Sequence, residues 1–271
     1  MAQHTTVMSK QVGIIKLDGT IGGISFYTAG GQSLARVATG PSKERIAKDQ
    51  AFQRTRDNNK EFGGSAKAAK ALRLAMGGLL QTMGGRTIVA ELTRIFKSIN
   101  LRSPGVRGER PIALSANRAL LNNVEFNDKA RFSSIFSAPY SVSVNATRNE
   151  ATVVIDGFLP GNALQIPSGA THFNIICGVG IVSDYTLDPT TGAYQPAQPA
   201  QDSQGANTSS TALPINQAVA QQTLVVSVDA VPTVNASCST VVTLGIEFYQ
   251  QVNGQLYIFA QDNAMKVIGV F

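Results

Sequence analysis

The side chains that most often carry out catalysis or bind metals are few in this sequence and lie far apart. The 271 residues include two histidines, His4 and His172, and two cysteines, Cys177 and Cys238. A structural zinc site takes four Cys or His ligands in short paired spacings, and the sequence has no C-x-x-C pair. We therefore predict no metal site. We interpret His172 as a residue at a strand edge or an interface.

Hydrolytic chemistry has no recognisable framework either. A nucleophile triad needs a histidine oriented by an acid, and His172 and Asp184 share one β-rich region, but no G-x-S-x-G turn is present. The glycine-rich segments 19–23 and 84–87 lack the spacing of phosphate-binding loops. We predict that the protein is not an enzyme and uses no cofactor. The acids that could pair for glycoside chemistry are scattered, as is usual for a soluble sheet: Glu150, Asp156, Asp184, Asp188 and Glu247.

The two cysteines lie in strand-like stretches about sixty residues apart, a spacing that a β-sandwich could bring together. Residues 1–10 are polar and contain no apolar export segment, and no run of about 18 apolar residues could span a membrane. We predict two reduced, buried thiols and cytoplasmic synthesis. Release by lysis or by a non-standard route stays open.

Charge is divided unevenly along the chain. Residues 1–131 hold 21 Lys and Arg against 9 Asp and Glu, a net charge of +12. Residues 132–271 hold only Arg148 and Lys266 against 8 acids, a net charge of −6. Such a division favours an acidic partner for the first half or contact between copies of the chain, although solvated helix faces would give the same pattern.

The basic residues of the first half are the candidates for binding nucleic acid or another acidic partner. Phe52 and Phe62, the aromatic residues among them, stand at core-like helix positions, which does not indicate a platform for stacking bases. The candidates are Lys43, Arg45, Lys48, Arg54, Arg56, Lys60, Lys67, Lys70, Arg73, Arg102, Arg107 and Arg110.

The first 131 residues are predicted to form short strands at the start and helices after them. Turns at Asp18-Gly19 and Gly30-Gly31 separate three short predicted strands, at 11–17, 21–27 and 33–39. Ser42 is a candidate helix cap. Helical spacing of apolar residues predicts helices at 43–62, 66–81 and 87–99, separated by glycine pairs, then a basic loop at 101–111 and a short helix at 115–122.

The second half has the period-two alternation of strands. Asn253-Gly254 between two apolar runs indicates a hairpin, and Gly178 and Gly180 are candidate bulge positions. Residues 187–215 are rich in Pro, Gln, Ser and Thr and are predicted to be a surface loop with little regular structure. The predicted strands are 140–147, 151–158, 171–185, 223–228, 240–249, 256–261 and 265–270.

These elements predict an α+β protein. We expect an N-terminal arm and β-meander over residues 1–40, a basic helical region over 41–131, and an antiparallel β-sandwich of about seven strands over 132–271.

Several motifs resemble a family of bacterial proteins of about this length with no known activity. The first is the GTIGGISFY segment at residues 19–27, and the second is the AFQRTRDNNKEFG segment at 51–63. Further matches are Pro41-Ser42, the KAAKALR segment at 67–73, and the ATHF segment at 170–173. Gln50 stands where the family more often has proline. The resemblance implies no activity, and its residue types suit backbone geometry and protein contacts.

Our leading hypothesis is a structural protein that assembles with copies of itself into a ring, tube, filament or shell, through contact between its basic and acidic regions. The alternatives are a protein that binds or packages RNA or DNA through the basic helices, and a sandwich module that binds a ligand such as a carbohydrate. The absence of tryptophan counts against the last. Candidate assembly residues are Phe26, Tyr27, Arg36, Asp184, Asp188 and Asp202.

Overall fold

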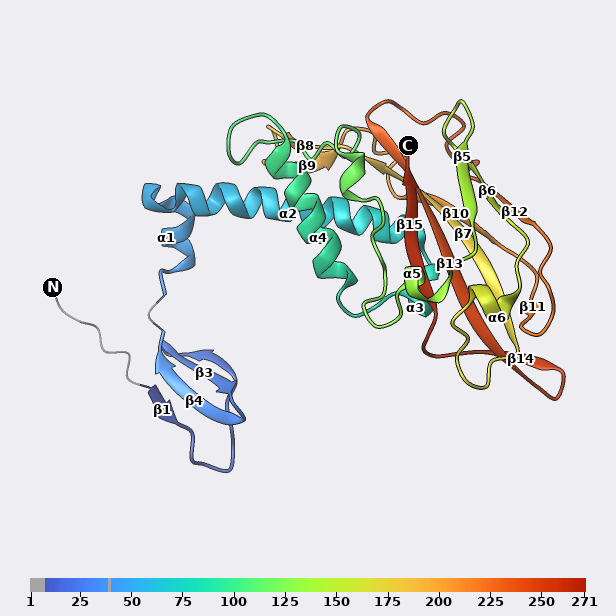
Figure 1. Cartoon of the computed structure of the whole chain (residues 1–271). Helices are drawn as coiled ribbons and strands as arrows, with labels where there is room; N and C mark the ends of the chain where they lie inside the picture. Colours follow the sequence, from blue (N-terminus) through green and yellow to red (C-terminus); the bar gives the residue numbers. More distant parts are fainter. Residues whose placement is uncertain (1–7, 39) are drawn as a thin grey trace. The chain divides into compact units, whose positions relative to one another are not determined.

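The computed structural model describes residues 8–38 and 40–271, and the chain divides into two compact units, residues 1–55 and 56–271 (Figure 1). His4 lies outside the described residues. The fold is α+β, as the sequence predicts, with a meander and helices followed by antiparallel sheets.

The first unit contains a four-stranded antiparallel sheet in the order β1-β4-β3-β2. Two-residue turns at Gly22-Gly23 and Gly30-Gly31 join its strands, and all four glycines have positive φ. The predicted strand at 11–17 is instead a connection between two shorter strands. The strands are β1 (Met8–Lys10), β2 (Gly19–Ile21), β3 (Ile24–Ala29) and β4 (Gln32–Val37).

Short helices follow this sheet. In α1 (Lys43–Lys48) the side chain of Ser42 accepts a hydrogen bond from the Arg45 N–H at 3.2 Å, which confirms the predicted cap. A 3-10 helix, η1 (Gln50–Phe52), leads directly into the long helix α2 (Gln53–Met76).

The predicted break in α2 at residues 63–65 does not occur. The helix runs through this position, and the glycine makes room for a side chain instead of ending the helix. A Cβ on Gly64 would lie 2.4 Å from Cγ of Tyr194. Gly77-Gly78 ends the helix, and α3 (Leu79–Met83) and α4 (Ile88–Arg102) follow. The apolar side chains of α4 form the buried face that the helical period predicts.

Two long antiparallel strands, β7 (His172–Ser183) and β13 (Cys238–Val252), form the centre of the second unit. They belong to a six-stranded sheet, and a three-stranded sheet in the order β12-β6-β5 packs over one of its faces. The remaining strands are β5 (Tyr140–Val144), β6 (Glu150–Ile155), β8 (Tyr185–Asp188), β9 (Ala193–Pro196), β10 (Gln204–Ser209), β11 (Leu213–Pro214), β12 (Gln222–Ser227), β14 (Gln255–Ile258) and β15 (Ala264–Val270).

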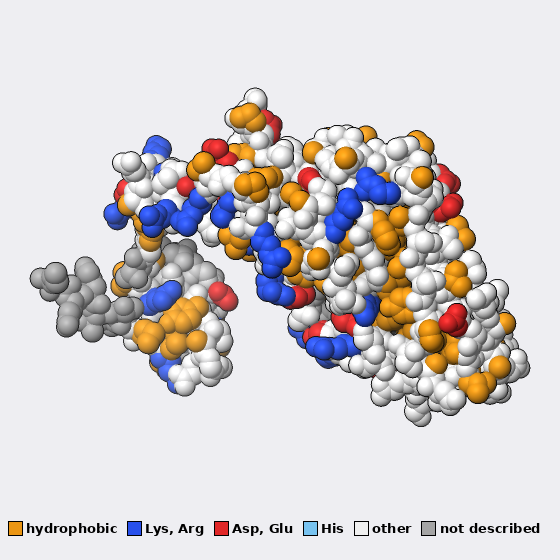
Figure 2. Space-filling view, turned by 45° about the horizontal axis from the view of Figure 1, so that its top comes forward, with side chains coloured by type: hydrophobic (Ala, Val, Ile, Leu, Met, Phe, Trp, Pro, Cys, Tyr) orange, Lys and Arg blue, Asp and Glu red, His pale blue; other side chains and the backbone are white. Residues whose placement is uncertain are grey.

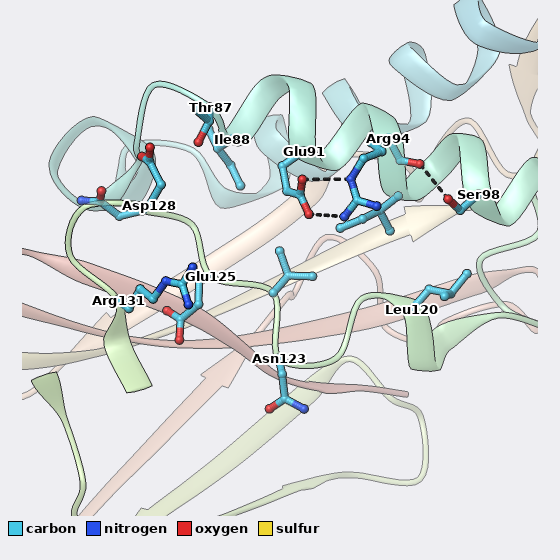
Figure 3. Close-up of a pocket in the computed structure, with 13 residues that line it drawn as sticks. Thr87, Ile88, Glu91, Arg94, Ser98, Leu120, Asn123, Glu125, Asp128 and Arg131 are labelled. Atoms are coloured by element: carbon cyan, nitrogen blue, oxygen red, sulfur yellow. Dashed lines mark hydrogen bonds and ion pairs between the residues drawn. The ribbon is translucent and has the colours of Figure 1, made fainter. Parts of the chain in front are cut away.

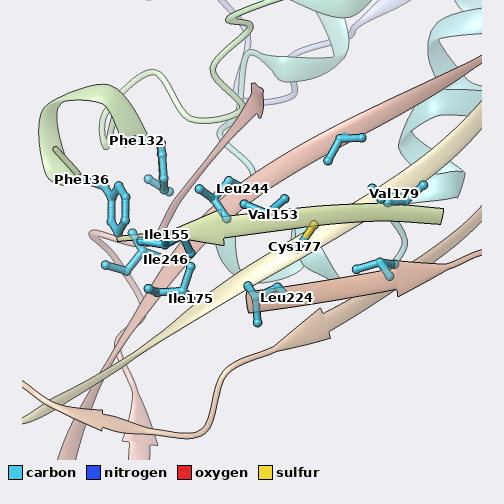
Figure 4. Close-up of a cluster of buried hydrophobic side chains, with 14 of the residues drawn as sticks. Phe132, Phe136, Val153, Ile155, Ile175, Cys177, Val179, Leu224, Leu244 and Ile246 are labelled. Atoms are coloured by element: carbon cyan, nitrogen blue, oxygen red, sulfur yellow. The ribbon is translucent and has the colours of Figure 1, made fainter. Parts of the chain in front are cut away.

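The space between the two sheets is the larger apolar core (Figure 4). Val153 and Ile155 of β6 face Ile175 and Cys177 of β7, and Leu244 of β13 joins them. All five side chains are buried. This layer confirms the predicted sandwich, and its edges are closed by α5 (Phe132–Ile135) and α6 (Pro160–Ala163).

Helices α2, α3 and α4 cover the other face of the six-stranded sheet (Figure 1). Gly178 and Gly180 are not at bulges, because the β7–β13 register runs without interruption from Ser183 to His172. They allow the helices to lie close: a Cβ on Gly180 would lie 2.5 Å from Cε of Met76. A Cβ on Gly205, paired with Gly180, would lie 2.0 Å from the Ala75 carbonyl oxygen.

The expected regions 41–131 and 132–271 therefore share one core. The second buried cluster joins Leu72 and Phe96 of the helices to Val182, Val241 and Met265 of the sheet. Burying one face of the sheet under the helices makes the two regions inseparable, and the boundary between compact units falls near residue 55 instead.

The segment 187–215 is also more regular than its composition suggests. It contains the end of the β8–β9 hairpin, and β10 and β11 both pair with β7. The prediction of a loop is wrong here. Pairing with β7 supplies hydrogen bonds to the backbone N–H and C=O groups of this polar segment, so it forms strands. The predicted short helix at 115–122 is a single 3-10 turn, η2 (Arg118–Leu120). No helix in the described part of the chain is long and apolar enough to cross a membrane.

Candidate assembly surfaces

The described histidine and the two cysteines lie on different strand positions and do not share a site. His172 begins β7, and its Nδ1 lies 3.0 Å from Oγ1 of Thr171. Cys177 and Cys238 are free thiols, both fully buried, as expected. Burial raises the pKa of Cys177 to about 12, which leaves it an inert thiol at neutral pH. Among residues 8–38 and 40–271, no group of three or more His, Cys, Asp or Glu side chains converges.

A hollow of about 520 Å³ lies between α4 and residues 120–131 (Figure 3). Two of the three acids that line it accept hydrogen bonds from neighbouring residues of the chain. Glu91 accepts hydrogen bonds from Arg94 at 2.5 and 3.0 Å, and Glu125 accepts from the Phe132 and Ser133 N–H groups at the start of α5. None of the lining residues is a histidine or a cysteine.

The basic candidates of the first unit lie on short exposed segments. Lys43, Lys48 and Arg54 are exposed. Arg45 bonds to Asp49 at 3.1 Å and lies 5.8 Å from the centre of the Phe52 ring. Arg45 is thus held on its own helix by local contacts.

Three basic candidates form one exposed stripe on α2: Lys60, Lys67 and Lys70. Lys67 also donates to the Tyr194 carbonyl oxygen at 3.0 Å. Basic side chains gather over the helical part of the chain (Figure 2). Arg56 and Arg73 are half-buried on the same helix, and Nε of Arg73 is enclosed without a hydrogen-bond partner among the described residues.

Arg110, another basic candidate, is part of a buried ion cluster and is not a surface residue. Its guanidinium bonds to both carboxylate oxygens of Glu61, at 2.8 and 2.7 Å, and Lys97 bonds to the same carboxylate at 2.6 Å. The Gly108 N–H adds a fourth bond at 2.8 Å. Glu61 is fully buried, and burial raises its pKa, but these hydrogen bonds outweigh burial and lower the pKa to about 2.

The ion cluster fastens the basic loop 101–111 to helices α2 and α4. The Arg110 carbonyl oxygen accepts from Nδ2 of Asn100 at 2.7 Å and from the Tyr194 hydroxyl at 2.8 Å. Of the three arginines in the loop, Arg102 and Arg107 are exposed. The sequence gives little signal for this arrangement, because Glu61 is one of two acids, with Asp57, in a densely basic stretch of helix.

The acidic candidates for assembly are engaged inside the second unit. Asp184 accepts from the N–H and hydroxyl of Ser115, and Asp202 accepts from the Tyr185 hydroxyl at 2.5 Å. Asp188 caps its own turn by accepting from the Thr191 hydroxyl at 2.7 Å. Each of these partly buried carboxylates already accepts hydrogen bonds within the chain.

The N-terminal sheet exposes side chains on both of its faces. No described residue before Glu61 is buried, so the sheet has no core of its own. The strand register places Phe26 on one face and Tyr27 and Arg36 on the other, where the Arg36 guanidinium lies 5.3 Å from the centre of the Tyr27 ring.

One face of this sheet is apolar. The register aligns Ile21, Ile24 and Val37 in one row and Phe26 and Ala35 in the next. We call these five residues the apolar face. Ile21, Ile24 and Val37 are 61%, 42% and 59% exposed. Figure 2 shows hydrophobic side chains gathered on the described part of the first unit. Sequence reasoning identified Phe26 and missed the other four, although their alternation was visible.

Comparison with known proteins provides no relative from which a role could be transferred: no family model, curated protein or solved structure matches the chain.

Proposed function

We propose that the protein is a structural component that assembles with copies of itself, and that the N-terminal sheet is the main point of contact. The observation that carries the proposal is the uncovered sheet, which has no buried side chain and exposes Ile21, Ile24 and Val37. A small antiparallel sheet needs packing on at least one face to be stable in water. A contiguous exposed apolar patch supports a contact with another protein surface.

Charge has a secondary part in this proposal. After residue 131 the exposed acids are Asp156, Asp229 and Asp262, which are far apart in sequence. They can attract the basic helices of another copy over a distance and align it, but exposed charge pairs add little affinity. We therefore assign most of the binding energy to apolar burial and the salt-sensitive part to the opposite charges of the two halves.

Light scattering after size exclusion tests the proposal directly. The purified chain should give masses above 28.6 kDa that rise with protein concentration. Because burial is mainly apolar, raising salt to 0.5 M should weaken the association only modestly. Negative-stain microscopy of the same samples should show one repeated assembly. A monodisperse monomer at every concentration and at both salt levels would rule the proposal out.

Nucleic-acid binding is the second candidate, and the stripe of Lys60, Lys67 and Lys70 favours it. The stripe covers about 15 Å of helix, a length that several phosphates of one strand would occupy. Three phosphate contacts predict that the logarithm of the binding constant falls with the logarithm of salt, with a slope of about −2.7 for duplex DNA and about −2 for a single strand. Anisotropy with labelled DNA and RNA measures it. A slope that stays the same when all three lysines become glutamine would refute this role for the stripe.

A further inference from the structure

The two faces of the N-terminal sheet differ in charge, and the difference decides what each can contact. The strand register places Lys10 and Arg36 on the face that carries Tyr27. The other side of the sheet carries the five residues of the apolar face and four more, none of them charged: Ser9, Gly19, Thr28 and Ser33.

This difference in charge determines which face of the sheet can pack against the same face of a second copy. Contact between two copies through the face with Lys10 and Arg36 would bring four cations together, and like charges across an interface are strongly unfavourable. Contact through the apolar face brings no charges together. Resting on the proposed self-assembly, we propose that two copies stack their N-terminal sheets face to face through the apolar face, related by a two-fold axis.

The edges of the sheet favour stacking over strand addition. Within the described residues, its outer strands, β1 and β2, are three residues long. Short edge strands offer few backbone hydrogen bonds to a partner strand, which is how sheets limit edge pairing. Packing of the faces, in contrast, forms the two-layer arrangement of a sandwich, with sheets about 10 Å apart.

The area of the apolar face sets the strength of the contact. From the strand spacing and rise, the paired residues cover on the order of 300 Å² per copy. Stable interfaces bury about 800 Å² per partner, so the stacked pair is a weak contact on its own. It therefore depends on concentration and is reinforced when other contacts link the same copies.

Cysteine cross-linking tests the geometry, and the native chain suits it because Cys177 and Cys238 are both buried. Ile24 lies in the middle of its row, between Ile21 and Val37. Ile24→Cys should give a covalent dimer with a short bismaleimide, at a yield at least fivefold above the control. Ser25→Cys is the matched control, since Ser25 is the next residue and lies on the opposite face.

The other outcomes separate this geometry from self-assembly as such. Val37→Cys is a second variant on the same row and should also cross-link. If the protein forms oligomers but neither Ile24→Cys nor Val37→Cys exceeds the control, face-to-face stacking is wrong while self-assembly stands. The same holds if Ile24→Cys cross-links instead to a copy with Val89→Cys, which lies in an apolar groove on α4. If light scattering shows only a monomer, both self-assembly and face-to-face stacking are wrong.

Discussion

Replacing Glu61 with glutamine isolates the charge of the buried ion cluster. The amide keeps the shape of the side chain but cannot balance the Arg110 guanidinium and the Lys97 ammonium, whose side chains are only 18% and 16% exposed. It also cannot accept all four hydrogen bonds that now reach the carboxylate. We expect Glu61→Gln to lower the free energy of unfolding while leaving the fold intact.

The magnitude follows from the pKa. The hydrogen bonds lower the pKa of Glu61 from 4.5 to about 2. A gap of this size corresponds to about 3 kcal/mol of stability. The cost of removing one partner from a buried ion pair is similar, at about 3–5 kcal/mol. Because the pKa is lower in the folded state, this stability is present above pH 4.5 and is lost as the pH falls toward 2.

Urea denaturation at several pH values measures the effect. The difference in unfolding free energy between wild type and Glu61→Gln should be largest at pH 6–7 and should shrink toward pH 2–3. Glu91→Gln is the control, because Glu91 pairs with Arg94 on the exposed side of α4 and should lose far less. Equal losses for the two variants, or a Glu61→Gln loss that does not change with pH, would refute the reasoning.

Two further predictions concern packing in the second unit. Gly205→Ala places a Cβ 2.0 Å from the Ala75 carbonyl oxygen and should destabilise the protein by about 1–3 kcal/mol in the same denaturation assay, whereas Gly161→Ala, with no atom within 4 Å, should change little. A destabilised Gly161→Ala with an unaffected Gly205→Ala would contradict the close approach of helix and sheet. Because burial raises the pKa of Cys177 to about 12 and also raises that of Cys238, neither thiol should react with Ellman's reagent at pH 8 until urea is added. Rapid reaction of either thiol in the folded protein would count against this burial.

The sequence was most informative where structure depends on neighbours along the chain. Gly30-Gly31 predicted the turn between β3 and β4, whereas the turn predicted at Asp18-Gly19 lies instead at Gly22-Gly23. The spacing of Leu92, Ile95, Phe96 and Ile99 predicted α4, and period-two alternation predicted the sandwich. Each of these signals acts over a few residues, so composition and periodicity are sufficient to identify it.

Features that depend on distant contacts could not be predicted this way. Gly64 indicates a helix break until Tyr194, 130 residues later, is known to pack on it. Arg110 resembles a surface cation until Glu61 is placed beside it. The polar segment 187–215 forms strands because β7 provides a ladder. The apolar face was missed for a different reason: its alternation was clear, but only the fold shows that no described residue of its own unit buries it.

Sedimentation velocity of wild type and Ile24→Asp over a hundredfold range of concentration tests the central claim most directly. Burying an isoleucine contributes about 1.5–3 kcal/mol, and a symmetric contact contains two copies of each substitution. We predict that wild type sediments as species heavier than 28.6 kDa and that Ile24→Asp weakens this association at least a hundredfold, with an unchanged circular dichroism spectrum. Identical oligomers for both proteins, or a wild type that remains a monomer throughout, would contradict assembly through the apolar face.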